Sequence, residues 1–129
     1  MIKNGIDIVK ISRIEKSLEN TSFFEKVFGE NEREELIKRN MPPESIAAAF
    51  AAKEAFGKAF EVGISGFSLC EVQVIHKDNG APFFLLSGCA KELAEKENCE
   101  LALSISHDGE YAIAIVTVFF EENQCDKPD

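Results

Sequence analysis

Residues 45–60 read SIAAAFAAKEAFGKAF, and this stretch decides the fold. It is rich in strong helix formers, and Pro43 stands just before it, at a first-turn position that tolerates proline. We predict one long helix from Glu44 to near Val62 and Gly63. The predicted helix is apolar nearly all round, so other elements must cover it.

A strand and three short helices are predicted ahead of the long helix. Half of residues 2–11 are β-branched and apolar, all Ile or Val, which indicates a strand. Three polar pairs with N-cap spacing follow, and a proline pair precedes the long helix. The pairs and the helices they predict are Ser12 with Glu15 for residues 12–20, Ser22 with Glu25 for 23–28, and Asn31 with Glu34 for 32–39.

Strands dominate the pattern after the long helix. We expect a loop over residues 64–67, and then a hairpin whose strands are 69–75 and 83–86, with an Asp-Asn-Gly turn at 78–80. A helix is expected over 87–98. Two further strands, 101–106 and 111–119, are expected around a tight turn at 107–110. Strands and helices mix without regular βαβ alternation. This favours an α+β fold with a largely antiparallel sheet packed on the long helix.

The size and composition indicate a single domain that folds. The chain has 129 residues, of which 45% are hydrophobic and 29% charged, so we expect one domain over residues 1–129 with a frayed acidic tail at about 120–129. No apolar run approaches the roughly 20 residues of a membrane span, and the N-terminus lacks the apolar stretch of a signal peptide. We expect neither membrane insertion nor secretion.

The cysteines indicate a reducing compartment. Cys70, Cys89, Cys99 and Cys125 form neither a CxxC pair nor a Cys/His zinc spacing. We interpret them as reduced cytosolic thiols and predict a cytoplasmic location.

The charge is acidic and unevenly distributed. A formal net charge of −9 disfavours binding to nucleic acid or to an anionic membrane surface. The first 28 residues hold five basic and four acidic side chains, so the remainder carries a net charge of −10. The first quarter is therefore the only part where an acidic partner would not meet general repulsion.

Three charged side chains are candidates for chemistry. Asp7 lies between Ile6 and Ile8, so it is either a solvated surface residue or a buried carboxylate that needs a cation. Glu54 and Lys58 stand one helical turn apart, either as a surface ion pair or as functional groups on a buried helix. Two carboxylates from different elements, with no Cys/His cluster, would suit Mg²⁺, and the lysine would neutralise phosphate charge.

His107 is a fourth candidate. It stands where the strand LALSIS meets the Asp-Gly turn, so its imidazole and the nearby backbone N–H groups would either meet a phosphate or remain solvated. The chain has no Walker A loop, no GxGxxG after a strand, no HExxH and no GxSxG. Common nucleotide-binding and hydrolase motifs are thus absent.

Three segments together resemble one known family. GIDIVKISRIE at 5–15, FAAKEAFGKAF at 50–60 and LSISHDGEYAIAIV at 103–116, with NGAP at 79–82, closely resemble the holo-(acyl carrier protein) synthases of the phosphopantetheinyl transferase superfamily. The segments follow the family's order and spacing over nearly the whole chain. The resemblance implies the phosphopantetheinyl transferase fold, and transfer of 4'-phosphopantetheine from coenzyme A to a serine of an apo-acyl carrier protein in fatty acid biosynthesis, leaving adenosine 3',5'-bisphosphate.

The resemblance also implies roles for individual residues. The Mg²⁺ ligands of the family match Asp7 and Glu54, and its phosphate-contacting lysine matches Lys58, which gives these three the catalytic role. Lys58, His107 and Gly63 match positions that contact coenzyme A. Two groups could accept the serine proton, a metal-bound water or Glu54 itself, and the sequence does not decide between them.

A docking surface and an assembly follow from the same resemblance. The arginine that docks the carrier protein matches Arg13, and Lys16 lies one turn away, on the face opposite Ile11, Ile14 and Leu18. The family forms homotrimers with active sites between subunits, so we expect the same here.

The chain departs from the family at three places. Ala49 stands where the family commonly has an arginine, Glu61-Val62-Gly63 where it has Gly-Thr-Gly, and Lys10 where it has a glutamate. The first two changes affect the expected coenzyme affinity more than the reaction type. Two alternatives are a non-catalytic homologue that binds carrier protein or nucleotide, and a small metal-dependent phosphohydrolase.

Overall fold

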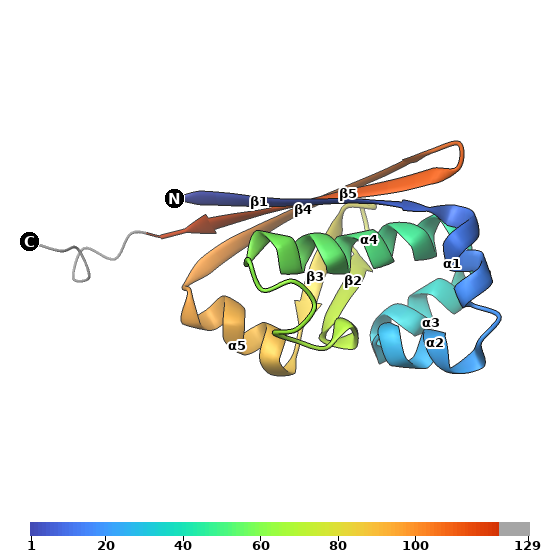
Figure 1. Cartoon of the computed structure of the whole chain (residues 1–129), viewed down its shortest axis with the longest axis horizontal. Helices are drawn as coiled ribbons and strands as arrows, with labels where there is room; N and C mark the ends of the chain where they lie inside the picture. The colour runs from blue at the N-terminus through green and yellow to red at the C-terminus, as the bar shows by residue number, and fades with distance from the viewer. Residues whose placement is uncertain (122–129) are drawn as a thin grey trace, which may run out of the picture.

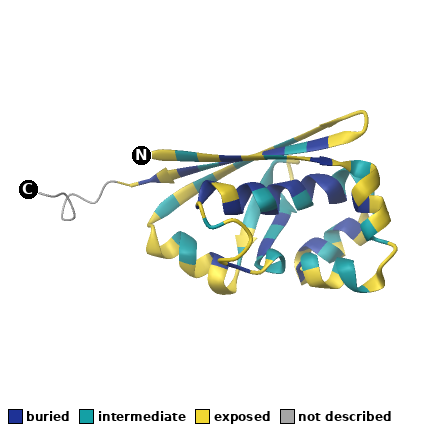
Figure 2. Cartoon of the chain, viewed as in Figure 1, coloured by how far each residue is buried: buried dark blue, intermediate teal, exposed yellow. Residues whose placement is uncertain are grey.

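Helix α4 (Pro43–Ala59) lies at the centre of the structure, and the other elements surround it (Figure 1). The computed structural model describes residues 1–121 of the chain. Eleven of the 17 residues of α4 are buried, as the apolar pattern predicts (Figure 2). The helix ends before Val62 because Glu61 adopts a left-handed φ of 62° and the Gly63 N–H bonds back to the Gly57 carbonyl.

All strand pairs are antiparallel, and they form two separate sheets. Strands β1 (Ile2–Lys10), β4 (Cys99–Asp108) and β5 (Tyr111–Phe120) form a three-stranded sheet in the order β1-β5-β4. Strands β2 (Val72–His76) and β3 (Pro82–Leu86) form a two-stranded hairpin. The α+β prediction is confirmed, although the expected single sheet is divided in two.

Small residues let α4 pack tightly on the three-stranded sheet. A Cβ atom at Gly5 would collide with the backbone carbonyl oxygen of Ala55, so only glycine allows β1 to approach the helix this closely. On β5, the buried Ala112 and Ala114 face the same helix. This close packing places the β1 side chains that point toward α4, Asp7 among them, beside the helix surface.

A cluster of aromatic rings covers the opposite side of α4. The Phe56 ring lies 5.1 Å from that of Phe67 and 5.6 Å from that of Phe84 on β3 (centroid to centroid). The helix is therefore held between the three-stranded sheet and the β2–β3 hairpin.

Four shorter helices complete the fold: α1 (Ile11–Ser17), α2 (Thr21–Val27), α3 (Glu30–Lys38) and α5 (Gly88–Lys96). A 3₁₀ turn at Leu69–Glu71 occupies the beginning of the strand predicted over residues 69–75. All four helices were expected, but the predicted starts of the first three are wrong.

The starts differ because other contacts replace the predicted caps, a tertiary hydrogen bond at α1 and local caps from different residues at α2 and α3. Helix α1 follows β1 directly without a cap from Ser12, and its first N–H bonds to the Glu110 carbonyl across the sheet. Asn20, predicted as the end of the first helix, instead caps α2 by accepting from the Ser22 N–H. Helix α3 begins after Gly29, whose N–H donates to the Glu32 carboxylate.

The β4–β5 turn is shorter than predicted. His107 lies inside β4, paired with Ala112, and only Gly109 and Glu110 form the turn. Phe120 is the last residue of β5 and is buried, so the predicted tail begins at least one residue too early, and its residues 122–129 lie outside the described part.

Two other expectations concern the described residues. None of their helices is long and apolar enough to cross a membrane. Cys70, Cys89 and Cys99 are free thiols, and Cys125 lies outside the described residues.

Candidate functional site

Asp7 and Lys58 meet where β1 packs on the last turn of α4. The Lys58 Nζ lies 3.0 Å from the Asp7 Oδ1 and also donates to the Ile6 carbonyl oxygen at 3.0 Å. The Asp7 side chain is 14% exposed, whereas that of Lys58 is 53% exposed. Asp7 is therefore a largely buried carboxylate with a partner, and the lysine that pairs with it reaches it from the solvent side.

Glu54 lies one turn before Lys58 and belongs to the same cluster. Burial and then the charge of Asp7 raise the pKa of Glu54 above its ordinary value, while Lys58 and Arg13 act in the opposite direction. A carboxylate whose charge is disfavoured by a second carboxylate nearby gains from a bound cation. The three residues Asp7, Glu54 and Lys58, separated by up to 51 positions in sequence, thus form one site.

The donor set of this site fits a hard divalent cation. Two carboxylates from different elements supply oxygen ligands, and the described residues contain no group of three or more His, Cys, Asp or Glu side chains that could hold a metal. Mg²⁺ is typically bound by one or two carboxylates and completes its shell with water and substrate phosphates. The site is suited to that mode and not to a closed all-protein cage.

Helix α1 carries two exposed basic side chains. Arg13 is exposed, and its charge acts to lower the pKa of Glu54. Lys16 is also exposed, and Ile14 on the other face of α1 is buried. Arg13 and Lys16 therefore form an exposed basic face on α1, which follows β1 directly. We call Asp7, Glu54 and Lys58 together the carboxylate cluster.

His107 does not join the carboxylate cluster. It lies on β4, separated by β5 from β1, and lines a pocket with Ala49, Ser45 and Arg39 on the β4 side of α4. Ala49 and Glu54 are five residues apart, about 140° around the helix at 100° per residue. One chain thus presents two sets of predicted site residues on different sides of the same helix.

Gly63 lies in the loop that follows α4. It is exposed and has a left-handed φ of 61°, and nothing stands within 4 Å of where its Cβ would be. Glycine is thus required by the backbone conformation and not by a close neighbour. The neighbouring Glu61 makes an ion pair with Lys3, with 3.2 Å between Oε2 and Nζ.

A buried ion pair was missed by the sequence analysis. Lys53 and Glu32 are both fully buried and hydrogen-bonded to each other. Lys53 also donates to the carbonyls of Leu69 and Val72, and Glu32 accepts from the Val74 N–H at 2.9 Å. The retained lysine in an apolar helix was the only sequence signal, and its partner lies 21 positions away.

Comparisons with known proteins agree on one family. The model of the 4'-phosphopantetheinyl transferase superfamily matches residues 4–116. The chain is 41% identical over 121 residues to a holo-[acyl-carrier-protein] synthase of Caldanaerobacter subterraneus, covering 92% of this chain and 95% of that protein. It is 44% identical to the one of Clostridium novyi, covering 92% and 88%.

A solved structure extends the likeness to three dimensions. The Helicobacter pylori holo-[acyl-carrier-protein] synthase in complex with coenzyme A superposes with a TM-score of 0.78 at 38% sequence identity. The match covers 92% of this chain and 99% of that one.

Proposed function

We propose that this chain, which belongs to the 4'-phosphopantetheinyl transferase superfamily, uses the carboxylate cluster as its catalytic centre. It transfers 4'-phosphopantetheine from coenzyme A to a serine hydroxyl of an apo-acyl carrier protein and releases adenosine 3',5'-bisphosphate. The observation that carries the assignment of the centre is the meeting of Asp7, Glu54 and Lys58 at the junction of β1 and α4.

Asp7 and Glu54 are the proposed Mg²⁺ ligands. Their oxygen donors and mutual repulsion fit this ion, which would supply positive charge at the pyrophosphate of coenzyme A. Asp7 is held in place by Lys58 and by the strand pairing of β1, so its carboxylate needs little reorganisation when it binds.

Lys58 is proposed to stabilise the leaving group. The serine oxygen forms a bond to the phosphorus that carries pantetheine, the bond from this phosphorus to the bridging oxygen breaks, and charge develops on the departing phosphate. The Lys58 amine is half exposed and has three donors, of which two are used by Asp7 and Ile6. A donor remains for a phosphate oxygen as its charge grows.

Mass spectrometry of the carrier protein tests this function. The chain is incubated with Mg²⁺, coenzyme A and an apo-acyl carrier protein, and a phosphopantetheine adduct on the carrier is expected together with adenosine 3',5'-bisphosphate. A non-catalytic homologue would give neither product. A phosphohydrolase would release free phosphopantetheine and leave the carrier unmodified.

The free thiols support a proposed cytoplasmic location. Cys70, Cys89 and Cys99 are unpaired, and Cys89 is exposed. Proteins of oxidising compartments seldom keep several free thiols, so a reducing compartment fits this chain.

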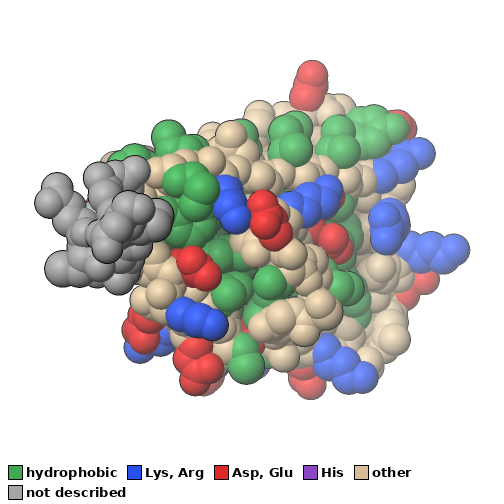
Figure 3. All heavy atoms as spheres, turned by 60° about the vertical axis from the view of Figure 1, so that its left-hand side comes forward, with side chains coloured by type: hydrophobic (Ala, Val, Ile, Leu, Met, Phe, Trp, Pro, Cys, Tyr) green, Lys and Arg blue, Asp and Glu red, His purple; other side chains and the backbone are tan. Residues whose placement is uncertain are grey.

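Arg13 and Lys16 are the proposed docking surface for the carrier protein. Both are exposed on α1, and the charge of Arg13 acts on Glu54, so a carrier docked there would present its serine beside the carboxylate cluster. Basic side chains gather at the end of the molecule that carries α1 (Figure 3). An acidic partner would be repelled by most of this chain and attracted here.

Reversing the charge of Arg13 should weaken docking. We expect Arg13→Glu to raise the KM for carrier protein about 10-fold at low salt, mainly through slower encounter, with a much smaller effect on the KM for coenzyme A. The difference in KM for carrier protein between wild type and Arg13→Glu should become smaller as salt is added, because the Debye length falls from about 10 Å at 0.1 M to about 3 Å at 1 M. Steady-state kinetics at several salt concentrations measure this.

Lys91→Glu is the matched control for the docking prediction. Lys91 is an exposed lysine on α5, which lies at the other end of the molecule from α1 (Figure 1). The same charge reversal there should leave the KM for carrier protein unchanged. Equal effects of the two variants would place the docking surface elsewhere.

A homotrimer with shared active sites is also proposed. Six of the ten exposed large hydrophobic side chains in the described residues lie on the face of the three-stranded sheet that points away from α4 (Ile2, Ile6, Ile8, Tyr111, Ile115 and Phe119). Figure 3 shows hydrophobic side chains along the upper edge of the molecule, where this sheet lies. An apolar patch of this kind on a chain of this size marks an interface.

The placement of His107 supports an active site that is shared between two subunits. Within one chain, α4 stands between His107 and the carboxylate cluster, so the two cannot easily contact the same coenzyme molecule. In an assembly, the cluster of one copy and the His107 of the next copy can face each other and contact one coenzyme molecule. A cyclic assembly repeats such a site at every subunit boundary.

Mixing two impaired variants tests the shared site. Glu54→Gln and His107→Ala homotrimers should each have low activity. When the two chains are unfolded together and refolded in equal amounts, about one quarter of the boundaries should combine an intact Glu54 with an intact His107, so activity should return to about one quarter of wild type. Activity no higher than the average of the two variants, or a monomer in sedimentation at micromolar concentration, would overturn the shared site.

A further inference from the structure

Two ion pairs of opposite polarity join β1 to the end of α4. Lys3 and Asp7 lie on the same face of β1, with Gly5 between them, and this face points toward α4. Asp7 pairs with Lys58, with 3.0 Å between Oδ1 and Nζ. Lys3 pairs with Glu61, with 3.2 Å between Nζ and Oε2. The strand and the helix end thus each present one cation and one anion, in an order that matches unlike charges.

Glu61 occupies a position that is unfavourable for a glutamate. It closes the helix: its N–H donates to the Lys58 carbonyl, and the Val62 N–H donates to the Gly57 carbonyl, each at 3.1 Å. This helix ending needs the left-handed φ of 62° that Glu61 adopts, a conformation that glycine takes without strain. The carboxylate also stands at the negative end of the helix dipole. The ion pair with Lys3 offsets part of this cost.

Lys3 is well placed to hold the carboxylate. Its side chain is 31% exposed, and its Nζ lies 5.6 Å from the centre of the Phe120 ring. Phe120 is buried, and its ring forms an edge-to-face pair with that of Phe60, the residue just before Glu61. The ammonium group is therefore held by the strand and by an aromatic ring beside the helix end, and it loses little freedom when it pairs.

Lys58 is a competing partner for Glu61. The two residues are three positions apart at one helix end, a spacing at which a lysine and a glutamate ordinarily pair. Within residues 1–121, however, no ion pair joins them: Lys58 binds Asp7 and the Ile6 carbonyl, and Glu61 binds Lys3. The Lys58 amine therefore keeps one N–H donor open, and the proposed function gives this donor to a phosphate.

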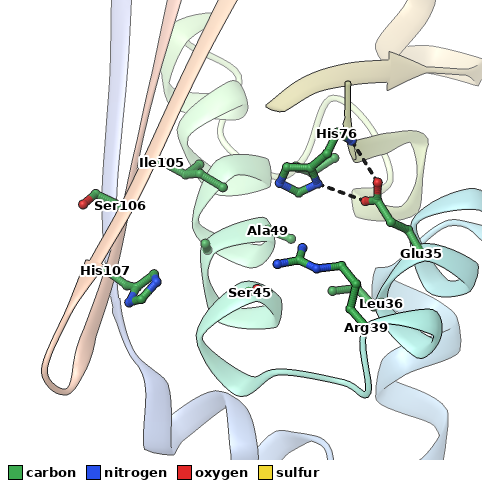
Figure 4. Close-up of a pocket in the computed structure, with 11 residues that line it drawn as sticks. Glu35, Leu36, Arg39, Ser45, Ala49, His76, Ile105, Ser106 and His107 are labelled. Atoms are coloured by element: carbon green, nitrogen blue, oxygen red, sulfur yellow. Dashed lines mark hydrogen bonds and ion pairs between the residues drawn. The ribbon is translucent and has the colours of Figure 1, made fainter. Parts of the chain in front are cut away.

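The pocket around His107 lies apart from both ion pairs. Its lining comes from the C-terminal part of α3 and from α4, β2 and β4, and it includes neither Lys3 nor Glu61 (Figure 4). A substitution at either residue is thus expected to act on the carboxylate cluster and not on this pocket.

We propose that Lys3 is a positioning residue for Lys58: by binding the Glu61 carboxylate, it leaves the Lys58 amine open to a phosphate of coenzyme A. In the proposed function, on which this inference rests, the pyrophosphate of the coenzyme is bound at the carboxylate cluster. Without Lys3, Glu61 takes the open donor of Lys58 and adds a third negative charge beside the phosphates. Lys3 acts through these two residues and takes no part in the transfer step.

The two partners of the Lys3–Glu61 pair should differ in their effect on activity. Lys3→Met keeps the side-chain stem but frees the Glu61 carboxylate, so kcat/KM for coenzyme A should fall about 10-fold at low salt. Lys3→Gln should behave alike. Glu61→Gln breaks the same ion pair without freeing a carboxylate, and kcat/KM should stay within about two-fold of wild type. An ion pair that only holds the fold would give similar effects from either side.

Double variants and nucleotide binding complete the test. Lys3→Met combined with Glu61→Gln should return kcat/KM for coenzyme A to within about two-fold of wild type. Lys3→Met combined with Glu61→Gly should do the same, and it also removes the left-handed strain. Calorimetry with adenosine 3',5'-bisphosphate should rank the variants in the same order, and this measurement involves neither carrier protein nor transfer.

Lys91→Met is the matched control. Lys91 pairs with Glu95 on α5, with 4.0 Å between Nζ and Oε1. The substitution therefore also frees a glutamate from its lysine, but on an element that contributes no residue to the carboxylate cluster. Both kcat/KM for coenzyme A and the affinity for adenosine 3',5'-bisphosphate should remain at the wild-type level.

Each outcome separates this inference from the proposed function. If wild type modifies the carrier protein but Lys3→Met keeps full kcat/KM, or if Glu61→Gln loses as much as Lys3→Met, the role of Lys3 is wrong and the proposed function stands. Failure of the double variants to recover would also overturn the role. So would a gain in Glu61→Gln as large as the loss in Lys3→Met, because the two charges would then act independently on the coenzyme. If wild type transfers nothing from coenzyme A to any carrier, the proposed function itself fails.

Discussion

Replacing Glu54 with glutamine is expected to reduce kcat about 10³-fold or more while the protein keeps its fold. The amide is nearly isosteric with the carboxylate, and Glu54 makes no hydrogen bond with the described residues that folding would lose. The substitution removes one of the two proposed carboxylate ligands of Mg²⁺ and leaves Asp7, already paired with Lys58, as the only carboxylate of the cluster. Formation of holo-carrier protein, followed by mass spectrometry, measures the loss.

Two further measurements make the Glu54 prediction specific. Titration with Mn²⁺ in place of Mg²⁺ should show weaker metal binding in Glu54→Gln, and circular dichroism should show an unchanged fold. Glu44→Gln, which removes the same charge from the first turn of the same helix, should keep near-normal activity. A Glu54→Gln protein with a near-normal rate, or one that does not fold, would return Glu54 to an ordinary structural role.

Replacing Lys53 with methionine is expected to destabilise the protein by about 3 to 5 kcal/mol, the range for breaking a buried ion pair. The substitution preserves the bulk of the side chain but leaves the fully buried Glu32 carboxylate without its cation. Burial already raises the pKa of Glu32 and lowers that of Lys53, and each charge is the main factor that opposes the shift of the other. Urea unfolding monitored by circular dichroism measures the change in the free energy of unfolding.

A double variant and a control on the same helix test this account of Lys53. Lys53→Met combined with Glu32→Gln should be less destabilised than the sum of the two single variants, because neither charge remains buried alone. Lys58→Met, which removes an exposed lysine five positions later, should change the free energy of unfolding by less than about 1 kcal/mol. Similar losses for Lys53→Met and Lys58→Met would show that burial of the ion pair is not what matters.

Several features could be predicted because they depend on local periodicity. The run at 45–60 indicated α4, and the Asp-Gly signal indicated the β4–β5 hairpin, although the turn itself proved to contain only Gly109 and Glu110. The one-turn spacing of Glu54 and Lys58 placed both on one face of α4, because every α-helix repeats at 3.6 residues. Asp7 was singled out as a carboxylate in an apolar strand that needs a partner, and Lys58 is that partner.

Helix starts could not be predicted in the same way. The polar pairs beginning at Ser12 and Asn31 had the spacing of caps, yet α1 takes its first bond from Glu110, and the amide of Glu32 in the first turn of α3 donates to the Gln73 side chain. A side-chain cap contributes about 1 kcal/mol, so a tertiary hydrogen bond readily replaces it. Sequence spacing cannot reveal a partner that lies 41 positions away.

By itself, the sequence determined the main elements, the antiparallel α+β class and the candidate residues, because these follow from helical and strand periods and from motifs that occupy consecutive positions. Only the tertiary structure decided which candidates meet. It joined Asp7 to Glu54 and Lys58, placed His107 on the other side of α4, buried Lys53 against Glu32, and paired Glu35 with His76. The physical reason is that each of these outcomes depends on which side of α4 a distant element packs against, and that choice is made by the summed burial of the core and not by any local pattern.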